Sequence, residues 1–190
     1  MNIDQHLARR IAVDGRTVAV FDGLIESREL AGLVQRLEQS PFTHTESARP
    51  DTRQHRHWVL NLPPEVGRSL PLLAPSLAAA QLVSGGNAYR DYRAYCNYSS
   101  YGDVLLTHTD AQPGADEFTA LWFLSTEWNP EWGGETLFFD AQGDAQAVVS
   151  PRPGRLVIFD GSIPHCGRPP TRICYAPRFT FAYKLERVPG

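Results

Sequence analysis

The sequence predicts a mainly β protein with flanking helices, in which a double-stranded β-helix (jelly roll) is buttressed by helices that precede it. Three observations support this fold class. After Gly86 the chain contains short runs of strand-forming residues, Pro, Gly and Asp separate the runs, and no helical period lies between them. The runs expected to form strands are residues 90–98, 104–107, 118–125, 136–139, 147–149, 155–159 and 178–185.

Helical patterns dominate the part of the chain before these runs. A short strand at 18–21 leads into a helix that Ser27 is expected to cap and that the Ser-Pro pair at 40–41 ends. Its apolar residues recur at i, i+3, i+4 and i+7, which indicates packing against a sheet. They are Leu30, Leu33, Val34 and Leu37. A second helical region runs from the Pro-Pro pair at 63–64 to the Gly-Gly pair at 85–86.

The stretch between the two helical regions is expected to cover the molecule's active site. Residues 42–54 are polar and have no period, which predicts a loop, and long loops in compact enzymes often serve as lids. A strand is expected at 55–60, where His55 and His57 would share one face. Three alternatives are open for this pair: a second metal site, ordinary surface or hydrogen-bonded histidines, or one histidine that faces the substrate.

The composition indicates one folded domain. The chain has 190 residues, of which 42% are hydrophobic, so it is long enough to bury a core and too apolar to be disordered. We expect a single domain over residues 1–190, with a helical and lid part at about 1–86 and the jelly-roll core at about 87–190.

Charge, hydropathy and cysteine content argue against several classes of function. The net charge of -3 and the absence of a polybasic block disfavour a nucleic-acid partner. No apolar run has the length of a membrane span, and the first residues lack the features of a secretory signal. Three cysteines are too few for a disulfide framework and suggest reduced thiols. A cytoplasmic protein with no membrane partner is therefore expected.

Two histidines and an aspartate form the most informative pattern in the chain. His108 and Asp110 are two residues apart, so at a strand end their side chains project to the same side, and His165 follows 57 residues after His108. Two imidazoles and one carboxylate are the ligands of the facial triad, which holds Fe(II) and leaves positions open for a cosubstrate and O2. An H-x-D pair alone is common, but the distant histidine and a following Arg-x-Thr make the pattern specific.

The Arg-x-Thr sequence suggests an anion site. Arg178, Thr180 and Lys184 would lie on one face of the last strand, and Phe179 on the other. If the polar face points into the barrel, the buried guanidinium needs an anion, and a carboxylate matches its bidentate fork. The alternative is a salt bridge on an outer sheet face, and the triad favours the anion site. Arg172 is a competing candidate, although its neighbouring prolines indicate a loop.

Five segments in the last hundred or so residues resemble the prolyl-4-hydroxylase-like branch of the 2-oxoglutarate/Fe(II)-dependent dioxygenases. They are residues 98–110, 132–136, 153–159, 164–165 and 177–180. The resemblance implies that the triad binds Fe(II) and that O2 and 2-oxoglutarate are cosubstrates, and it allows ascorbate as a further cofactor. It also implies that the distal carboxylate of 2-oxoglutarate binds to Arg178 and Thr180.

Tyr98 matches a family tyrosine that reaches the cosubstrate. A core aromatic is the alternative role for Tyr98, and Tyr95 or Tyr101 are alternative candidates for the contact. The chain departs from the pattern of some relatives at Phe123, where they carry a tyrosine that helps to bind the distal carboxylate. Lys184 stands where nucleic-acid demethylases of the superfamily carry a second arginine, which disfavours a DNA or RNA substrate.

The resemblance implies hydroxylation of an aliphatic C–H bond, with release of succinate and CO2, because the aspartate of the triad disfavours halogenation. The expected substrate is a small molecule, an amino acid or a peptidyl residue such as proline, and the oligomeric state is open. Three arginines in residues 42–60, the region expected to cover the substrate, either recognise a carboxylate or phosphate on the substrate or form a solvated face. They are Arg49, Arg53 and Arg56. The rival function is a jelly-roll metal-binding protein without oxygenase activity, such as a cupin-like isomerase or a ligand sensor.

Overall fold

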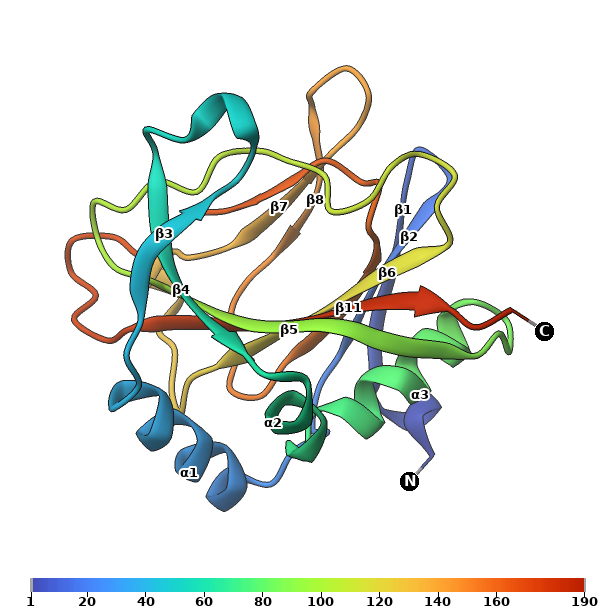
Figure 1. The fold of residues 1–190 in the computed structure, drawn as a ribbon, viewed down its shortest axis with the longest axis horizontal. Coiled ribbons are helices and arrows are strands. Elements are labelled where there is room, and N and C mark those ends of the chain that lie inside the picture. The colour runs from blue at the N-terminus through green and yellow to red at the C-terminus, as the bar shows by residue number, and fades with distance from the viewer. Residues whose placement is uncertain (1, 190) are drawn as a thin grey trace.

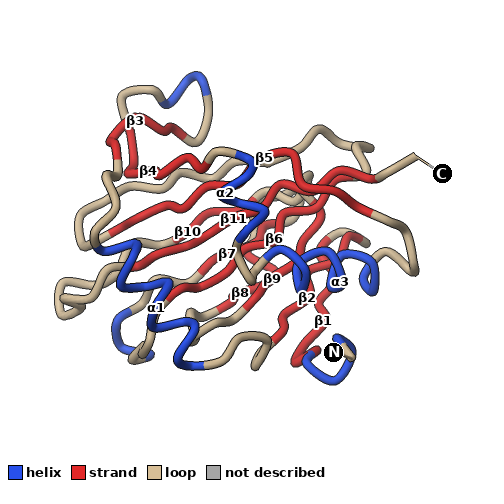
Figure 2. The backbone as a smooth tube through the Cα atoms, turned by 60° about the horizontal axis from the view of Figure 1, so that its bottom comes forward, coloured by secondary structure: helices blue, strands red, loops and turns tan. Residues whose placement is uncertain are grey.

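The computed structural model describes residues 2–189 and contains two facing β-sheets with helices on one side (Figures 1 and 2). The large sheet has eight strands in the order β1-β2-β9-β6-β11-β5-β4-β3, and the small sheet has the order β10-β7-β8. All strand pairs in both sheets are antiparallel. Two facing antiparallel sheets confirm the jelly-roll class. Among the described residues, none of the helices combines the length and the hydropathy that a membrane span requires.

The large sheet draws its strands from the whole chain. The strands are β1 (Leu7–Val13), β2 (Arg16–Phe21), β3 (Thr43–Ser47), β4 (Arg56–Leu62), β5 (Tyr89–Ser99), β6 (Glu117–Leu124), β9 (Leu156–Asp160) and β11 (Arg178–Arg187). The small sheet consists of β7 (Thr136–Phe139), β8 (Ala145–Val149) and β10 (His165–Gly167). Because β2 pairs with β9 and β4 pairs with β5, the large sheet continues across the position of residue 86 in the chain.

Three α-helices cover the outer face of the large sheet (Figure 1). They are α1 (Ser27–Glu38), α2 (Pro64–Ser69) and α3 (Leu73–Val83), and short 3-10 helices lie at Ile3–His6 (η1), Pro50–Thr52 (η2) and Pro130–Trp132 (η3). All four apolar residues predicted for the first helix are buried. Their packing against the sheet confirms the predicted buttress.

Successive side chains of β11 point alternately into the helix-covered core and into the interior between the sheets. Phe179, Phe181 and Tyr183 are buried in the cluster that packs beneath the helices. Arg178 and Lys184, at alternate positions, are buried on the opposite face. A second apolar cluster, which includes Phe123, Phe138 and Phe159, fills the space between the sheets. The polar face of β11 therefore points into the barrel, as the anion-site hypothesis requires.

Several predicted elements are corrected by the structure. Residues 104–107 do not form a strand, and the 42–54 stretch contains β3, an exposed edge strand whose polar residues give no alternation signal. Glu26, not Ser27, is the N-cap of α1, without a side-chain hydrogen bond. The second helical region is split into α2 and α3.

Candidate metal and cosubstrate site

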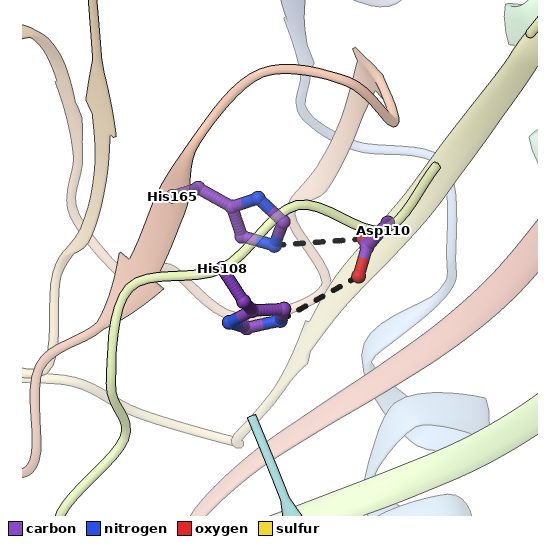
Figure 3. A group of neighbouring side chains, drawn as sticks. All are labelled: His108, Asp110 and His165. Carbon is purple, nitrogen blue, oxygen red and sulfur yellow. Dashed lines mark ion pairs between the residues drawn. The ribbon is translucent and has the colours of Figure 1, made fainter. Parts of the chain in front are cut away.

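The predicted triad comes together between the two sheets (Figure 3). His108 and Asp110 lie on the irregular segment between β5 and β6, and His165 begins β10. One potential ligand atom from each side chain lies within 4.8 Å of the others. The Nε2 atoms of His108 and His165 each lie 3.5 Å from a different oxygen of the Asp110 carboxylate.

Backbone hydrogen bonds fix the ring orientation of both histidines. His108 Nδ1 lies 2.9 Å from the carbonyl oxygen of Leu106, and His165 Nδ1 lies 2.9 Å from that of Ile163. A carbonyl can only accept, so Nδ1 carries the proton in each ring and the neutral ring keeps a lone pair on Nε2. Burial lowers the pKa of His165 to about 4, which keeps this ring neutral near pH 7. Two lone pairs facing one carboxylate form a site for a cation.

Asp110 has further partners behind the triad. Thr119 Oγ1 donates a hydrogen bond of 2.6 Å to Asp110 Oδ2, and the buried ammonium of Lys184 forms an ion pair with the same oxygen. Lys184 Nζ also donates to Thr119 Oγ1 at 3.0 Å. Burial alone would raise the pKa of the Asp110 carboxyl, but Lys184 and the two imidazoles hold it well below its ordinary range. The carboxylate is therefore charged and oriented. Sequence reasoning placed Lys184 on the inner face but missed this ion pair.

Arg178 is a buried cation without an acidic partner. Its side chain is held by Nε–H donating to the Gly134 carbonyl at 2.7 Å, and by longer bonds to the hydroxyls of Thr136 and Thr180 at 3.2 and 3.4 Å. The residue is 2% exposed, and within the part of the chain that the structure describes no carboxylate lies within 4.0 Å of it. Burial lowers the pKa of Arg178 to about 10, against the opposing effect of Glu135. The group remains cationic at pH 7 and lacks an anion.

A small cavity of about 50 Å³ joins this arginine to the triad. All three triad residues line it, together with Arg178 and Thr180. Glycines leave room around the guanidinium, because a Cβ at Gly134 or Gly167 would lie 3.2 Å from an atom of Arg178. Phe123 packs with its ring centroid 5.4 Å from Arg178 Cζ and supplies no hydroxyl. The cavity has cation-binding ligands at one end and an anion-binding group at the other.

The structure corrects the expectation for Tyr98. On β5, Tyr98 is paired with Phe179, and its ring packs against Phe42, Trp58 and Phe179 on the helix side of the sheet. It does not line the cavity between the triad and Arg178. Tyr95, one of the alternatives, lies on the inner face and lines that cavity. The core-aromatic alternative for Tyr98 is the one that the structure favours.

The two histidines at the start of β4 differ in their surroundings. His55 is exposed, whereas His57 is buried and lines a second, larger cavity beside His108. The triad is the only group of metal-ligating side chains found among residues 2–189, so a second metal site at this pair is not supported. Arg49 donates from its guanidinium to the carbonyl of Thr107, and Arg53 is exposed.

Comparison with known proteins supports the fold and the resemblance to the dioxygenases. The family model of the 2OG-Fe(II) oxygenase superfamily matches residues 95–183, a segment that contains the triad and Arg178. Over this segment the chain is similar to the 2OG-Fe(II) oxygenase superfamily. The chain has no match among curated proteins. The superfamily uses Fe(II) and 2-oxoglutarate, and the cation site and the unpaired arginine fit these two groups.

Solved structures with the same fold include enzymes with different chemistry. A prolyl-4-hydroxylase from Pseudomonas putida is 19% identical, with a TM-score of 0.62 and coverage of 91% of this chain and 93% of that chain. A 2OG-Fe(II) oxygenase family protein from Burkholderia pseudomallei is 18% identical, with a TM-score of 0.67 and coverage of 91% and 85%. SnoN, an alpha-ketoglutarate-dependent epimerase from nogalamycin biosynthesis, is 15% identical, with a TM-score of 0.67 and coverage of 96% and 81%. These likenesses establish the fold and leave the substrate open.

Proposed function

We propose that this protein is an Fe(II)- and 2-oxoglutarate-dependent dioxygenase that hydroxylates an aliphatic C–H bond. The reaction would consume one 2-oxoglutarate and one O2 per C–H bond, and yield the alcohol, succinate and CO2. The observation that carries the proposal is that one cavity has cation-binding side chains at one end and an anion-binding side chain at the other. At one end, two imidazole lone pairs and the Asp110 carboxylate converge as metal ligands, and at the other end the 2%-exposed Arg178 has no carboxylate partner among the described residues.

Each group has a defined role in this proposal. His108, Asp110 and His165 would hold Fe(II) on one face, and Arg178 with Thr180 would bind the distal carboxylate of 2-oxoglutarate. Bound Fe(II) supplies the redox chemistry with O2, for which protein side chains have no substitute. Ascorbate would act by keeping the iron ferrous.

The remaining residues orient the ligands and exclude water. Thr119 and Lys184 hold one oxygen of the Asp110 carboxylate, so the other oxygen would be available to bind Fe(II). The rings of Phe138 and Phe159 pack against the His165 imidazole, with centroids 5.9 and 4.6 Å away. These apolar contacts shield the buried side of the site from solvent.

The rival function, a jelly-roll metal-binding protein without oxygenase activity, does not account for Arg178. A metal site alone does not require a buried cation such as Arg178 at the other end of the cavity. A buried guanidinium without a counter-ion destabilises the fold. Binding of a dicarboxylate removes that cost. The oxygenase proposal therefore accounts for both ends of the cavity.

The test is anaerobic addition of Fe(II) and 2-oxoglutarate to the metal-free protein. A weak visible absorption band is expected from the chelate of 2-oxoglutarate on the iron, followed by succinate formation when air is admitted. Arg178→Ala should abolish the band at 2-oxoglutarate concentrations that saturate the wild type. Arg172→Ala, at an exposed arginine in the preceding loop, is the matched control. A band of full strength in Arg178→Ala would refute the assigned role of this arginine.

A further inference from the structure

A second cavity, of about 260 Å³, lies beside the triad on the side of the β3–β4 hairpin. His108, Asp110, Tyr95 and Asn97 line both this cavity and the smaller one that leads to Arg178. A molecule in the larger cavity would therefore lie next to the metal ligands without competing for Arg178. We call this space the hairpin cavity.

Two buried polar atoms in the hairpin cavity have no hydrogen-bond partner. They are Nδ1 of His57, a residue that is 5% exposed, and Oδ1 of Asn97. A buried polar atom without a partner destabilises the fold, so such atoms in a cavity indicate a ligand that satisfies them. An amide oxygen can only accept, and a neutral imidazole has one accepting nitrogen. Asn97 Oδ1 therefore requires a donor such as an amine, and His57 Nδ1 can accept from the same donor when the ring proton is on Nε2.

Opposite charges lie together in the lining of the same cavity. Arg93 Nη2 donates to Glu46 Oε2 at 2.6 Å, and the guanidinium lies over the Tyr95 ring, 4.4 Å from its centroid. The Arg93 and Glu46 side chains are 42% and 30% exposed. Deeper in the cavity, Lys184 and Asp110 form the second pair of opposite charges. A ligand with one positive and one negative group matches this arrangement better than an ion of either sign.

The hairpin restricts the size of what can bind. The guanidinium of Arg49, at the tip of the β3–β4 hairpin, donates to the carbonyl of Thr107, one residue before His108. The tip is thereby attached to the segment that carries the first two triad residues. This contact holds the hairpin against the triad segment, and a cavity of about 260 Å³ suits a single small molecule better than a polypeptide.

We propose that the hairpin cavity binds a free α-amino acid as the substrate, with its ammonium on Asn97 Oδ1, His57 Nδ1 and Glu46, and its carboxylate on Arg93. This proposal rests on the proposed function and names the substrate class of the same site. It selects the free, zwitterionic amino acid over the peptidyl residue. Both charged groups of a free amino acid are absent from a residue within a peptide.

Binding can be tested without turnover. The protein loaded anaerobically with Fe(II) and 2-oxoglutarate is titrated with each of the twenty free L-amino acids, and calorimetry and the melting temperature are recorded. At least one amino acid is expected to bind and raise the melting temperature. Its N-acetyl, C-amide derivative keeps the side chain but lacks both charges, and should bind at least about tenfold more weakly, since each charged contact contributes about 1.5 kcal/mol or more.

Variants assign the binding to the hairpin cavity. His57→Phe and Arg93→Met should each raise the Kd of that amino acid about tenfold or more, and leave the visible band of the iron chelate unchanged. His55→Phe, two residues away at an exposed position, should bind as the wild type does. A band that persists in His57→Phe also shows that this variant is folded.

Each unexpected result of these measurements has a different interpretation. Absence of the visible band in the wild type would refute the proposed function itself. A normal band with no binding of any free amino acid would refute only the substrate proposal. Equal or tighter binding of the blocked derivative would also overturn it, and would indicate a peptidyl substrate.

Discussion

His108 and His165 are 57 residues apart in the sequence and exchange both of their backbone hydrogen bonds, at 3.0 and 2.9 Å. This isolated bridge places the two imidazole centroids 4.5 Å apart. The segment that carries His108 has no regular structure of its own, and it is further fixed where the Asp110 and Ala111 amides donate to the Gly161 carbonyl at 2.8 and 2.9 Å. Main-chain pairing, rather than side-chain packing, sets the geometry of the triad.

Because Asp110 both belongs to the triad and pairs with Lys184, variants can separate its effect on metal binding from its effect on stability. Asp110→Ala should abolish binding of Fe(II) and also lower the free energy of unfolding by about 3 kcal/mol, because it leaves a buried ammonium unpaired. Asp110→Ala combined with Lys184→Met should recover most of that stability and still fail to bind iron. Urea denaturation of the metal-free proteins and iron content after dialysis measure the two effects. A double variant as unstable as the single one would contradict the coupling.

Gly134 is expected to control 2-oxoglutarate binding through Arg178. A Cβ at this position would lie 2.9 Å from Trp128 and 3.2 Å from the Arg178 Cδ, so Gly134→Ala should displace the guanidinium. The expected result is a Kd for 2-oxoglutarate raised at least about tenfold, with iron binding unchanged. Gly143→Ala is the matched control, since Gly143 also has a positive φ but no atom within 4 Å of the added Cβ. Similar losses in both variants would point to backbone strain alone.

The sequence was sufficient to predict that the triad side chains meet and that Arg178 faces the interior. Arg178 alternates with Phe179 on a strand, so period-2 reasoning assigns its face. His108 and Asp110 lie on an irregular segment, where the combination of ligand types rather than strand alternation indicated the site. The role expected for Tyr98 came from the family resemblance, which does not report the face of a strand. The irregular segment between β5 and His108 breaks the alternation, and a spacing of ten residues across it does not determine which face Tyr98 occupies.

Contacts made when the sheets close could not be predicted. Lys184 was expected on the inner face, but its partner Asp110 reaches it from a segment that only the backbone bridge holds in place. The strand β10 has three residues, too few for an alternation signal, and β3 is an exposed edge strand. These elements depend on pairing with distant residues, and local propensity does not report that pairing.

Two threonines should act on different ligands. Thr119→Val removes a 2.6 Å hydrogen bond to Asp110, and is expected to weaken Fe(II) binding about tenfold while 2-oxoglutarate binding to the iron-loaded protein is preserved. Thr136→Val removes a hydroxyl that accepts from Arg178 at 3.2 Å, and is expected to weaken 2-oxoglutarate binding and preserve iron affinity. Competition with a metal chelator and titration of the visible band measure the two affinities. If both variants changed the same affinity, the division of roles between the two ends of the cavity would be wrong.

Acid should weaken the ion pair that joins the end of β2 to the start of β9. Arg155 donates to both oxygens of the Asp22 carboxylate at 2.8 Å, and this hydrogen bonding lowers the pKa of Asp22 from its ordinary value of 3.8. A lowered pKa in the folded state means that the pair stabilises the fold fully at pH values above about 4, where the unfolded carboxyl is also ionised. That stabilisation decreases as the pH falls below 3.8 and is lost below the folded-state pKa.

The variant Asp22→Asn should therefore lower the free energy of unfolding by about 1–2 kcal/mol at pH 7, a modest value because the Asp22 side chain is 34% exposed. The difference from the wild type should shrink as the pH is lowered from about 4 toward about 2.5, since the wild-type carboxyl then becomes neutral as well. Urea denaturation across this range measures it, with Asp51→Asn as a control at an exposed arginine pair. A difference that stays constant with pH would show that the Asp22→Asn substitution perturbs packing rather than charge.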